Sequence, residues 1–184
     1  MKYKNIIRGE NCSLIRLKKD DGKAVELFYS LFNEEEIAIY LNQEYIKHKT
    51  KFQIGKWIAK KVESKVDVWY LVKWKTNYIG YICFKWREHY GEACEVSTSI
   101  ERNYRGLKLG YESSKILIDY ILTLNQFKYI VAYFFTGNIR AEKNLRKIGF
   151  RKATRLNKTV TREFYGGGES DNEDKNYTLM AIYT

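Results

Sequence analysis

The chain has 184 residues, 45% of them hydrophobic, and a formal net charge of +11. This length suits a single domain over residues 1–184 that buries about 70% of the surface of its unfolded chain. The sequence lacks an apolar run near the roughly 20 residues that span a bilayer and a signal-peptide pattern, so we expect a soluble cytoplasmic protein. The positive charge favours an anionic partner, which could be a nucleic acid, an anionic membrane surface or a polyphosphate cofactor.

A strand and several helices are expected in the first third of the chain. Residues 13–17 read as a strand, and apolar residues between 24 and 31 then recur at the i, i+3, i+4, i+7 spacing of one helical face. A short helix is expected around residues 37–41, and a further amphipathic helix includes residues 54–58. These helices are expected to flank a sheet.

An antiparallel meander follows. Residues 67–74 and 78–86 are runs of β-branched and aromatic residues, and the three residues between them have the length and chemistry of a hairpin connection. Residues 94–100 are expected to form its third strand. Each of the three cysteines, Cys12, Cys83 and Cys94, lies in such an apolar run without CxxC spacing, as reduced structural thiols do.

A β-turn-α-β unit is predicted next. Residues 117–124 carry a helical apolar stripe, and residues 129–135 form a continuous apolar run suited to a buried strand. A second helix then covers residues 141–148, with Asn138 as its N-cap and Gly149 as the left-handed residue that ends it.

Two final strands are predicted within residues 151–165 and 177–183, joined by a glycine-rich acidic tip. The order of elements predicts an α/β (α+β) fold, in which a mixed, mostly antiparallel, twisted sheet of about six to seven strands is flanked by about four helices. Ligands in such sheets favour the crevice where neighbouring strands diverge.

The turn at residues 105–110 reads Arg-Gly-Leu-Lys-Leu-Gly. A glycine-containing turn at a helix start aims backbone N–H groups and the positive end of the helix dipole at an anion. The turn is too short for a Walker A loop and is followed by Tyr111, and the G-x-G-x-x-G fingerprint of dinucleotide sites is absent. The sequence therefore predicts a phosphate-binding turn of another kind.

Together with Asn138 and the Lys-Ile-Gly-Phe sequence at 147–150, this turn resembles the GNAT superfamily of acyl-CoA-dependent N-acetyltransferases. Within it the chain is most similar to the branch of ribosomal-protein and polyamine acetyltransferases. In that family the amides of an R/Q-x-x-G-x-G/A turn bind the coenzyme A pyrophosphate. Arg105, Lys108 and Gly110 occupy its arginine, first-glycine and second-glycine positions, so Lys108 departs from the pattern. Either Gly106 supplies the missing backbone freedom, or Lys108 pairs with a phosphate.

The resemblance implies acetyl-CoA as cosubstrate and no metal. The side chain of Asn138 would reach the pantetheine arm, and Lys147 would reach the nucleotide end. The cofactor-binding residues that it implies are Ile100, Arg102, Arg105, Gly106, Leu107, Lys108, Leu109, Gly110, Tyr111, Asn138 and Lys147.

The chemistry needs a base, because an alkylamine with a pKa near ~10 is almost wholly protonated at neutral pH. By resemblance Glu95 is the catalytic base, and the alternative is an ordinary ion pair with a lysine or arginine. A backbone N–H near residues 99–101 would stabilise the oxyanion. Relatives often use a Tyr or Ser as general acid where this chain has Leu145 and Ala141, so water or Tyr133 would have to supply that proton.

In the resembling enzymes the acceptor enters between the early helices and the final hairpin. Both regions are acidic here, so we expect a cationic amine such as a polyamine, an aminoglycoside or a basic peptide terminus. The alternative is that these acids only solvate exposed loops. The acids in question are Glu34, Glu35, Glu36, Glu169, Asp171, Glu173 and Asp174.

The sequence thus predicts an N-acetyltransferase in which a primary amine of a small molecule or peptide attacks acetyl-CoA directly in a ternary complex. A non-catalytic acyl-CoA-binding or sensing module is the alternative. A nucleic-acid binder is disfavoured, because the basic residues are scattered and the aromatic residues fall at buried-strand spacing. We expect no nucleic-acid or membrane partner, and either a monomer or a homodimer.

Overall fold

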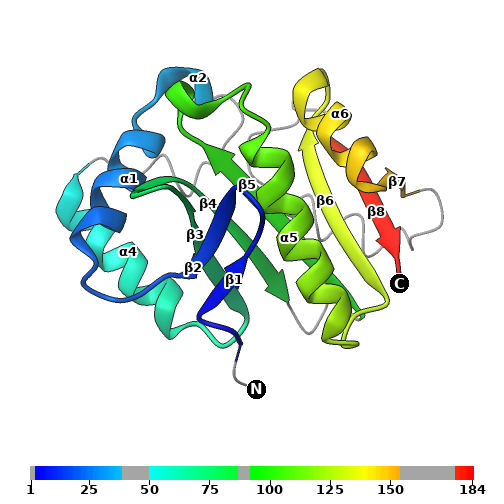
Figure 1. The fold of residues 1–184 in the computed structure, drawn as a ribbon, viewed down its shortest axis with the longest axis horizontal. Coiled ribbons are helices and arrows are strands. Elements are labelled where there is room, and N and C mark those ends of the chain that lie inside the picture. Colours follow the sequence, from blue (N-terminus) through cyan, green and yellow to red (C-terminus); the bar gives the residue numbers. More distant parts are fainter. Residues whose placement is uncertain (1–2, 39–49, 87–91, 154–176) are drawn as a thin grey trace, which may run out of the picture.

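The computed structural model describes residues 3–38, 50–86, 92–153 and 177–184. These residues form one mixed sheet of eight strands in the order β1-β2-β3-β4-β5-β6-β8-β7 (Figure 1). Neighbouring strands are antiparallel except β5 and β6, which are parallel. The strands are β1 (Ile6–Arg8), β2 (Cys12–Arg16), β3 (Asp67–Trp74), β4 (Asn77–Trp86), β5 (Ala93–Ile100), β6 (Tyr129–Phe135), β7 (Arg151–Lys152) and β8 (Tyr177–Tyr183).

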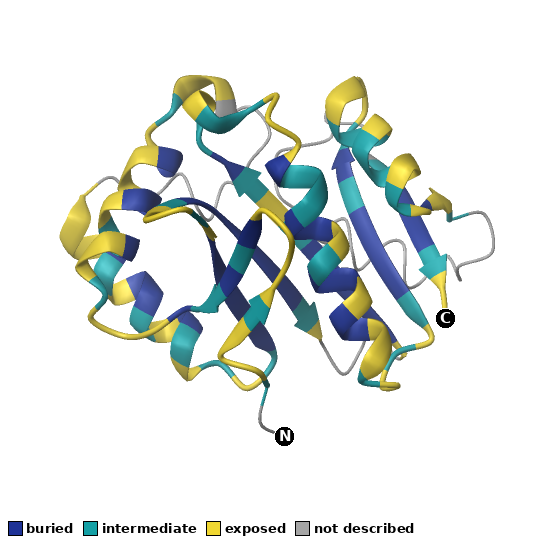
Figure 2. Ribbon diagram, viewed as in Figure 1, coloured by how far each residue is buried: buried dark blue, intermediate teal, exposed yellow. Residues whose placement is uncertain are grey.

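Helices cover both faces of the sheet. On one face α1 (Gly22–Phe32) and α4 (Lys51–Glu63) pack against β3 and β4 through an aromatic cluster that includes Phe28, Trp57 and Trp69. On the other face α5 (Leu109–Thr123) and α6 (Ile139–Ile148) pack over the remaining core. A short helix, α2 (Glu35–Ala38), follows α1, and a 3-10 turn covers Arg102–Tyr104. Figure 2 shows that most of β3 and β4 is buried between these layers.

The sequence predicted this fold class correctly, with more strands than expected. The additional strands are short, because β1 has three residues and β7 has two, and neither is long enough to show a hydrophobic period. The short helix expected near residues 37–41 begins earlier, at Glu35, and its expected end lies outside the described residues. Most of the strand expected over 151–165, and the acidic tip after it, also lie outside them.

The end signals of α6 were predicted correctly. Asn138 caps α6, since its side chain accepts a hydrogen bond from the N–H of Ala141 at 3.1 Å. Gly149 ends the same helix with a φ of 116°, and Phe150 behind it is fully buried. Cys12, Cys83 and Cys94 are free and buried, and burial raises the pKa of the Cys83 thiol to about 12.

None of the helices in the described residues has the length and apolar character needed to cross a bilayer. The described part of the chain also has no group of three His, Cys, Asp or Glu side chains placed to hold a metal ion.

Candidate active site

The parallel pair β5 and β6 separates part of the way along. Three residues of β5, Ala93 to Glu95, pair with β6, and the last of these pairs is Glu95 with Val131. Beyond it β5 stays paired with β4 as far as Ile100, and β6 stays paired with β8 as far as Phe135. Residues 96–100 of β5 and 132–135 of β6 are therefore not paired with each other. We call these two stretches together the splayed segment. It is the divergence of strands at which the sequence analysis expects a ligand.

Backbone groups of β5 are left without a sheet partner along the splayed segment. The N–H of Glu101 donates to the carbonyl of Ile79 on β4 at 2.9 Å. Because ladder bonds alternate in direction, the N–H groups of Val96, Thr98 and Ile100 are directed the other way, toward β6. The N–H of Val96 belongs to the last parallel pair, Glu95 with Val131, so the groups that have no β6 partner are those of Thr98 and Ile100. Of the residues expected to stabilise an oxyanion, Ile100 has its N–H directed into the splayed segment, and that of Glu101 is already bonded. Ile100 lies five residues beyond Glu95, roughly 17 Å along the strand, so the two residues are too far apart to act on one carbonyl group.

Glu95 lies at the last paired position before the strands separate. Cys94 and Val96 pack in the core beneath α5, and side chains alternate across a strand, so Glu95 faces the side on which α1 and α4 lie. Its Oε1 is 3.0 Å from Nζ of Lys85, and the two side chains are 7% and 11% exposed. The ion pair considered for Glu95 is thus present, and a part in catalysis remains a prediction.

The turn after β5 leads directly into α5. Gly106 and Lys108 both have left-handed backbones, with φ of 86° and 61°. The glycine at 106 therefore does not spare Lys108 a positive φ, because Lys108 itself adopts the left-handed conformation that favours glycine. Lys108 is also the N-cap residue of α5, and its side chain caps nothing.

The start of α5 differs from those of the other long helices. Among the described helices of eight or more residues, α1, α4 and α6 are capped by the side chains of Asp21, Thr50 and Asn138, whereas α5 has no side-chain cap. The first N–H groups of a helix need partners from outside it. Those of α5 are therefore available to an anion, and the helix dipole favours one there.

Arg105 in the turn and Arg102 just before it both contact acidic side chains. Arg105 Nη2 is 2.7 Å from Oε1 of Glu34, and Arg105 Nε donates to the carbonyl of Ile100 at 2.9 Å. Arg102 Nη2 is 3.3 Å from Oε1 of Glu36. Two of the three acids near residues 34–36 thus pair with this turn, which counts against their recognising a cationic acceptor. The four acids of the final hairpin lie outside the described residues.

Residues on and near α6 complete the end of the sheet. The N–H of Asn138 donates to the carbonyl of Phe135, the last residue of β6, at 2.9 Å. Since β5 and β6 are parallel, Asn138 lies at the same end of the sheet as the turn after β5. Lys147 Nζ lies 5.7 Å from the centre of the Tyr111 ring, which links α6 to the first turn of α5.

The positions of the expected general acid are apolar in the structure as well. Ala141 and Leu145 pack against the core under α6. Tyr133 is half-buried on β6, two residues beyond Val131 and so on the same face as Glu95. Tyr133 is therefore a phenol on the same sheet face as Glu95, on the β6 side of the splayed segment.

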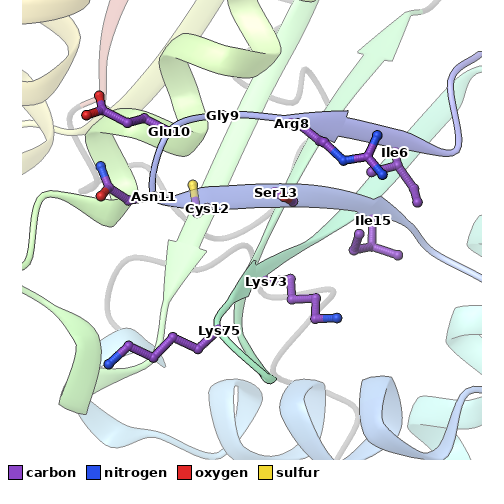
Figure 3. A pocket seen from close by; sticks show the side chains of 10 residues that line it. All are labelled: Ile6, Arg8, Gly9, Glu10, Asn11, Cys12, Ser13, Ile15, Lys73 and Lys75. Atoms are coloured by element: carbon purple, nitrogen blue, oxygen red, sulfur yellow. The ribbon is translucent and has the colours of Figure 1, made fainter.

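A separate depression of about 290 Å³ lies at the β1–β2 edge of the sheet (Figure 3). It is open and lined by side chains of both charges, which include Arg8, Lys73 and Glu10. Strands β3 and β4 separate β2 from β5 in the sheet, so this depression is distinct from the splayed segment. Two of its lining residues, Asn11 and Cys12, donate hydrogen bonds to Glu112 in the first turn of α5.

Comparison with known proteins supports the family that the sequence motifs resemble. The chain is similar in structure to the microcin C7 self-immunity acetyltransferase MccE in complex with acetyl-CoA and AMP, with 15% identity, 96% of this chain and 94% of that chain covered, and a TM-score of 0.74. It is also similar to RimL, a ribosomal L7/L12 α-N-protein acetyltransferase in complex with coenzyme A, with 14% identity, 97% of each chain covered and a TM-score of 0.75.

A third similar structure is a chimera of the spermidine N-acetyltransferase SpeG from Vibrio cholerae and hSSAT, with 15% identity, 95% of this chain and 96% of that chain covered, and a TM-score of 0.71. At these identities the likeness is one of fold. No curated protein matches the sequence significantly. A family model described as an acetyltransferase (GNAT) domain matches residues 13–151, which is most of the chain. The chain therefore belongs to the GNAT family of acetyl-CoA-dependent acetyltransferases.

Proposed function

We propose that this protein transfers an acetyl group from acetyl-CoA to a primary amine by direct attack in a ternary complex. The observation that carries the proposal is that Glu95 lies where β5 and β6 separate, while the uncapped start of α5 lies beyond the end of β5. The proposed base and the proposed anion site thus lie at opposite ends of the β5 stretch that has no β6 partner.

The chain's own residues fit coenzyme A. The N–H groups at the start of α5 suit the pyrophosphate, and Gly106 leaves open space, because a Cβ added there would meet no atom within 4 Å. The N–H groups of Thr98 and Ile100 suit the amide groups of an extended arm lying along β5. Coenzyme A supplies the acetyl group as a thioester, which is an activated acyl donor.

Glu95 is the proposed base for the amine. It accepts the proton that the substrate ammonium must lose before its nitrogen can attack the thioester, directly or through water. Tyr133 or water returns a proton to the thiolate. A thiol with a pKa near ~8.5 is a fair leaving group, so the absence of a Tyr or Ser at the positions of Ala141 and Leu145 is tolerable.

For the acceptor we propose the class used by ribosomal-protein and polyamine acetyltransferases, which is a peptide N-terminus or a polyamine. The similar structures of RimL, a ribosomal-protein acetyltransferase, and SpeG, a spermidine acetyltransferase, support this choice.

The test is release of free thiol from acetyl-CoA in the presence of spermidine, an aminoglycoside or a basic peptide with a free N-terminus. We expect turnover with at least one of them, and a fall in kcat of about 10²–10⁴-fold in Glu95→Gln, the usual effect of losing a general base. Turnover that is equal in Glu95→Gln would remove Glu95 from the mechanism. Failure of every amine, with acetyl-CoA bound, would contradict the proposed reaction.

A further inference from the structure

Arg105 and Glu34 join two segments that are far apart in the sequence. Nη2 of Arg105 lies 2.7 Å from one carboxylate oxygen of Glu34 and donates to the other at 2.8 Å. Nη1 of the same arginine is 3.5 Å from Oε2 of Glu36. The side chains of Arg105 and Glu34 are only 20% and 17% exposed, so water screens this pair less than an ordinary surface pair.

The pair also joins elements from opposite faces of the sheet. Glu34 follows α1, which packs on the face that carries Glu95, and Arg105 precedes α5, which packs on the other face. Figure 1 shows α2, which begins after Glu34, beside the loop that connects β5 to α5. The contact therefore passes around the end of the sheet where the splayed segment opens.

The turn between Arg105 and α5 makes little packing contact of its own. Gly106 and Lys108 are exposed, and Leu107 is 53% exposed. Arg105 is the point at which this turn is fixed, because its Nε donates to the carbonyl of Ile100 while its Nη2 donates to Glu34. The Arg105 side chain is thus engaged by acceptors within the protein, although the family resemblance implies a cofactor-binding residue at this position.

We propose that Glu34 is a positioning residue of the coenzyme turn. By holding Arg105 it fixes the turn that presents the first N–H groups of α5, so the acidic segment after α1 serves coenzyme binding and not amine recognition. This inference rests on the proposed function, which assigns the turn to the pyrophosphate.

The sign of the effect separates positioning from simple electrostatics. A carboxylate near the turn repels the pyrophosphate, so a purely electrostatic role predicts that Glu34→Gln binds acetyl-CoA more tightly. A direct contact from Arg105 to phosphate predicts the same, because the arginine would be released. Positioning predicts weaker binding, since the turn loses its anchor.

Calorimetric titration of acetyl-CoA into Glu34→Gln, Arg105→Lys and the double variant tests this. We expect each single variant to bind about tenfold more weakly, as for loss of a charge-assisted hydrogen bond, and the double variant to bind no more weakly than Arg105→Lys. Glu35→Gln is the matched control, because it removes the same charge from an exposed neighbouring residue and should change the dissociation constant less than twofold. Equal or tighter binding by Glu34→Gln, or additive losses in the double variant, would overturn the proposal.

Hydrogen–deuterium exchange of the protein without ligand supplies an independent readout. Glu34→Gln should speed amide exchange across residues 101–108 while leaving β3 unchanged, which also shows that the variant is folded. Unchanged exchange across 101–108 would refute positioning even if wild-type protein failed to bind acetyl-CoA. That failure by itself would count against the proposed function.

Discussion

Lys85 and Glu95 face each other directly across β4 and β5, with Nζ and Oε1 3.0 Å apart. On the other side of β4, Asp67 of β3 is the cross-strand partner of Lys85. Nζ of Lys61 from α4 lies 3.4 Å from Oδ2 of Asp67. A row of alternating charges thus crosses three strands and ends at the proposed base. Each member is mostly buried, so removal of any one leaves its neighbour desolvated.

The pair Lys85–Glu95 should contribute strongly to stability only while both members are present. Lys85→Met is expected to lower the free energy of unfolding by about 3 kcal/mol, because it leaves a buried carboxylate without its cation. Lys85→Met/Glu95→Gln should recover much of that loss, and urea unfolding of the two variants measures the difference. If the free energy lost in the double variant equals the sum of the losses in Lys85→Met and Glu95→Gln alone, the two residues are not coupled.

The backbone of Lys108 should be strained. Its φ of 61° is a conformation that costs a non-glycine residue roughly 1–2 kcal/mol, whereas an added glycine costs about 0.4–1 kcal/mol through the unfolded chain. Lys108→Gly is therefore expected to raise the free energy of unfolding by about 0.5–1 kcal/mol in urea titrations.

Lys75 offers a matched control for Lys108. It has a φ of 52° in the hairpin between β3 and β4, away from the turn after β5. Lys75→Gly should give a similar gain in stability with no change in acetyl-CoA affinity. Lys108→Gly should weaken acetyl-CoA a few-fold if its ammonium pairs with a phosphate. A loss of stability in both variants would contradict the strain argument.

Gly80 should be required for the end of β5. It pairs with Ile100, and a Cβ added to it would lie 2.3 Å from the carbonyl oxygen of Ser99, a backbone atom that cannot move aside cheaply. Gly80→Ala is expected to destabilise the fold by about 1–3 kcal/mol and to weaken acetyl-CoA binding by displacing Ile100. Gly55→Ala in α4 is the control. A Cβ added at Gly55 meets no atom within 4 Å, so this variant should raise the free energy of unfolding by about 1 kcal/mol. Similar results for the two variants in thermal unfolding would show that the contact at Gly80 relaxes.

Glu112 should make the free energy of unfolding depend on pH in the acidic range. Burial raises the pKa of its carboxyl, but hydrogen bonds from Asn11 and Cys12 outweigh this and lower the pKa below its ordinary value. A depressed folded pKa gives stability that is present above the unfolded value, about 4.3, and is lost as pH falls through the folded one. The stability difference between wild type and Glu112→Gln should therefore shrink below about pH 4. A difference that stays constant from pH 7 to 3 would argue against it.

Much of the fold could be predicted from the sequence because its signals are local. Periodicity located the meander and the long helices, and the chemistry of Asn138 and Gly149 located the ends of α6. The turn at residues 105–110 was recognised by its glycines, and its place before a helix that lacks a side-chain cap agrees with that reading.

The partners of the site residues could not be predicted, because they depend on register and on contacts between distant segments. Whether Lys85 faces Glu95 is decided by the pairing of β4 with β5, which a one-residue slip would change. Glu34 is 71 residues from Arg105, and its charge alone suggested solvent or an amine as its partner. The conformation of Lys108 was also hidden, since a lysine gives no signal for a positive φ.

Thermal unfolding with acetyl-CoA, compared with S-acetylpantetheine, tests the central claim most directly, because the second ligand has the thioester arm without the pyrophosphate. At ~100 times its dissociation constant acetyl-CoA should stabilise the fold by ~2.7 kcal/mol and raise the midpoint clearly, whereas S-acetylpantetheine at the same concentration should raise it little. No rise at millimolar acetyl-CoA, or an equal rise with both ligands, would contradict a coenzyme site at the start of α5.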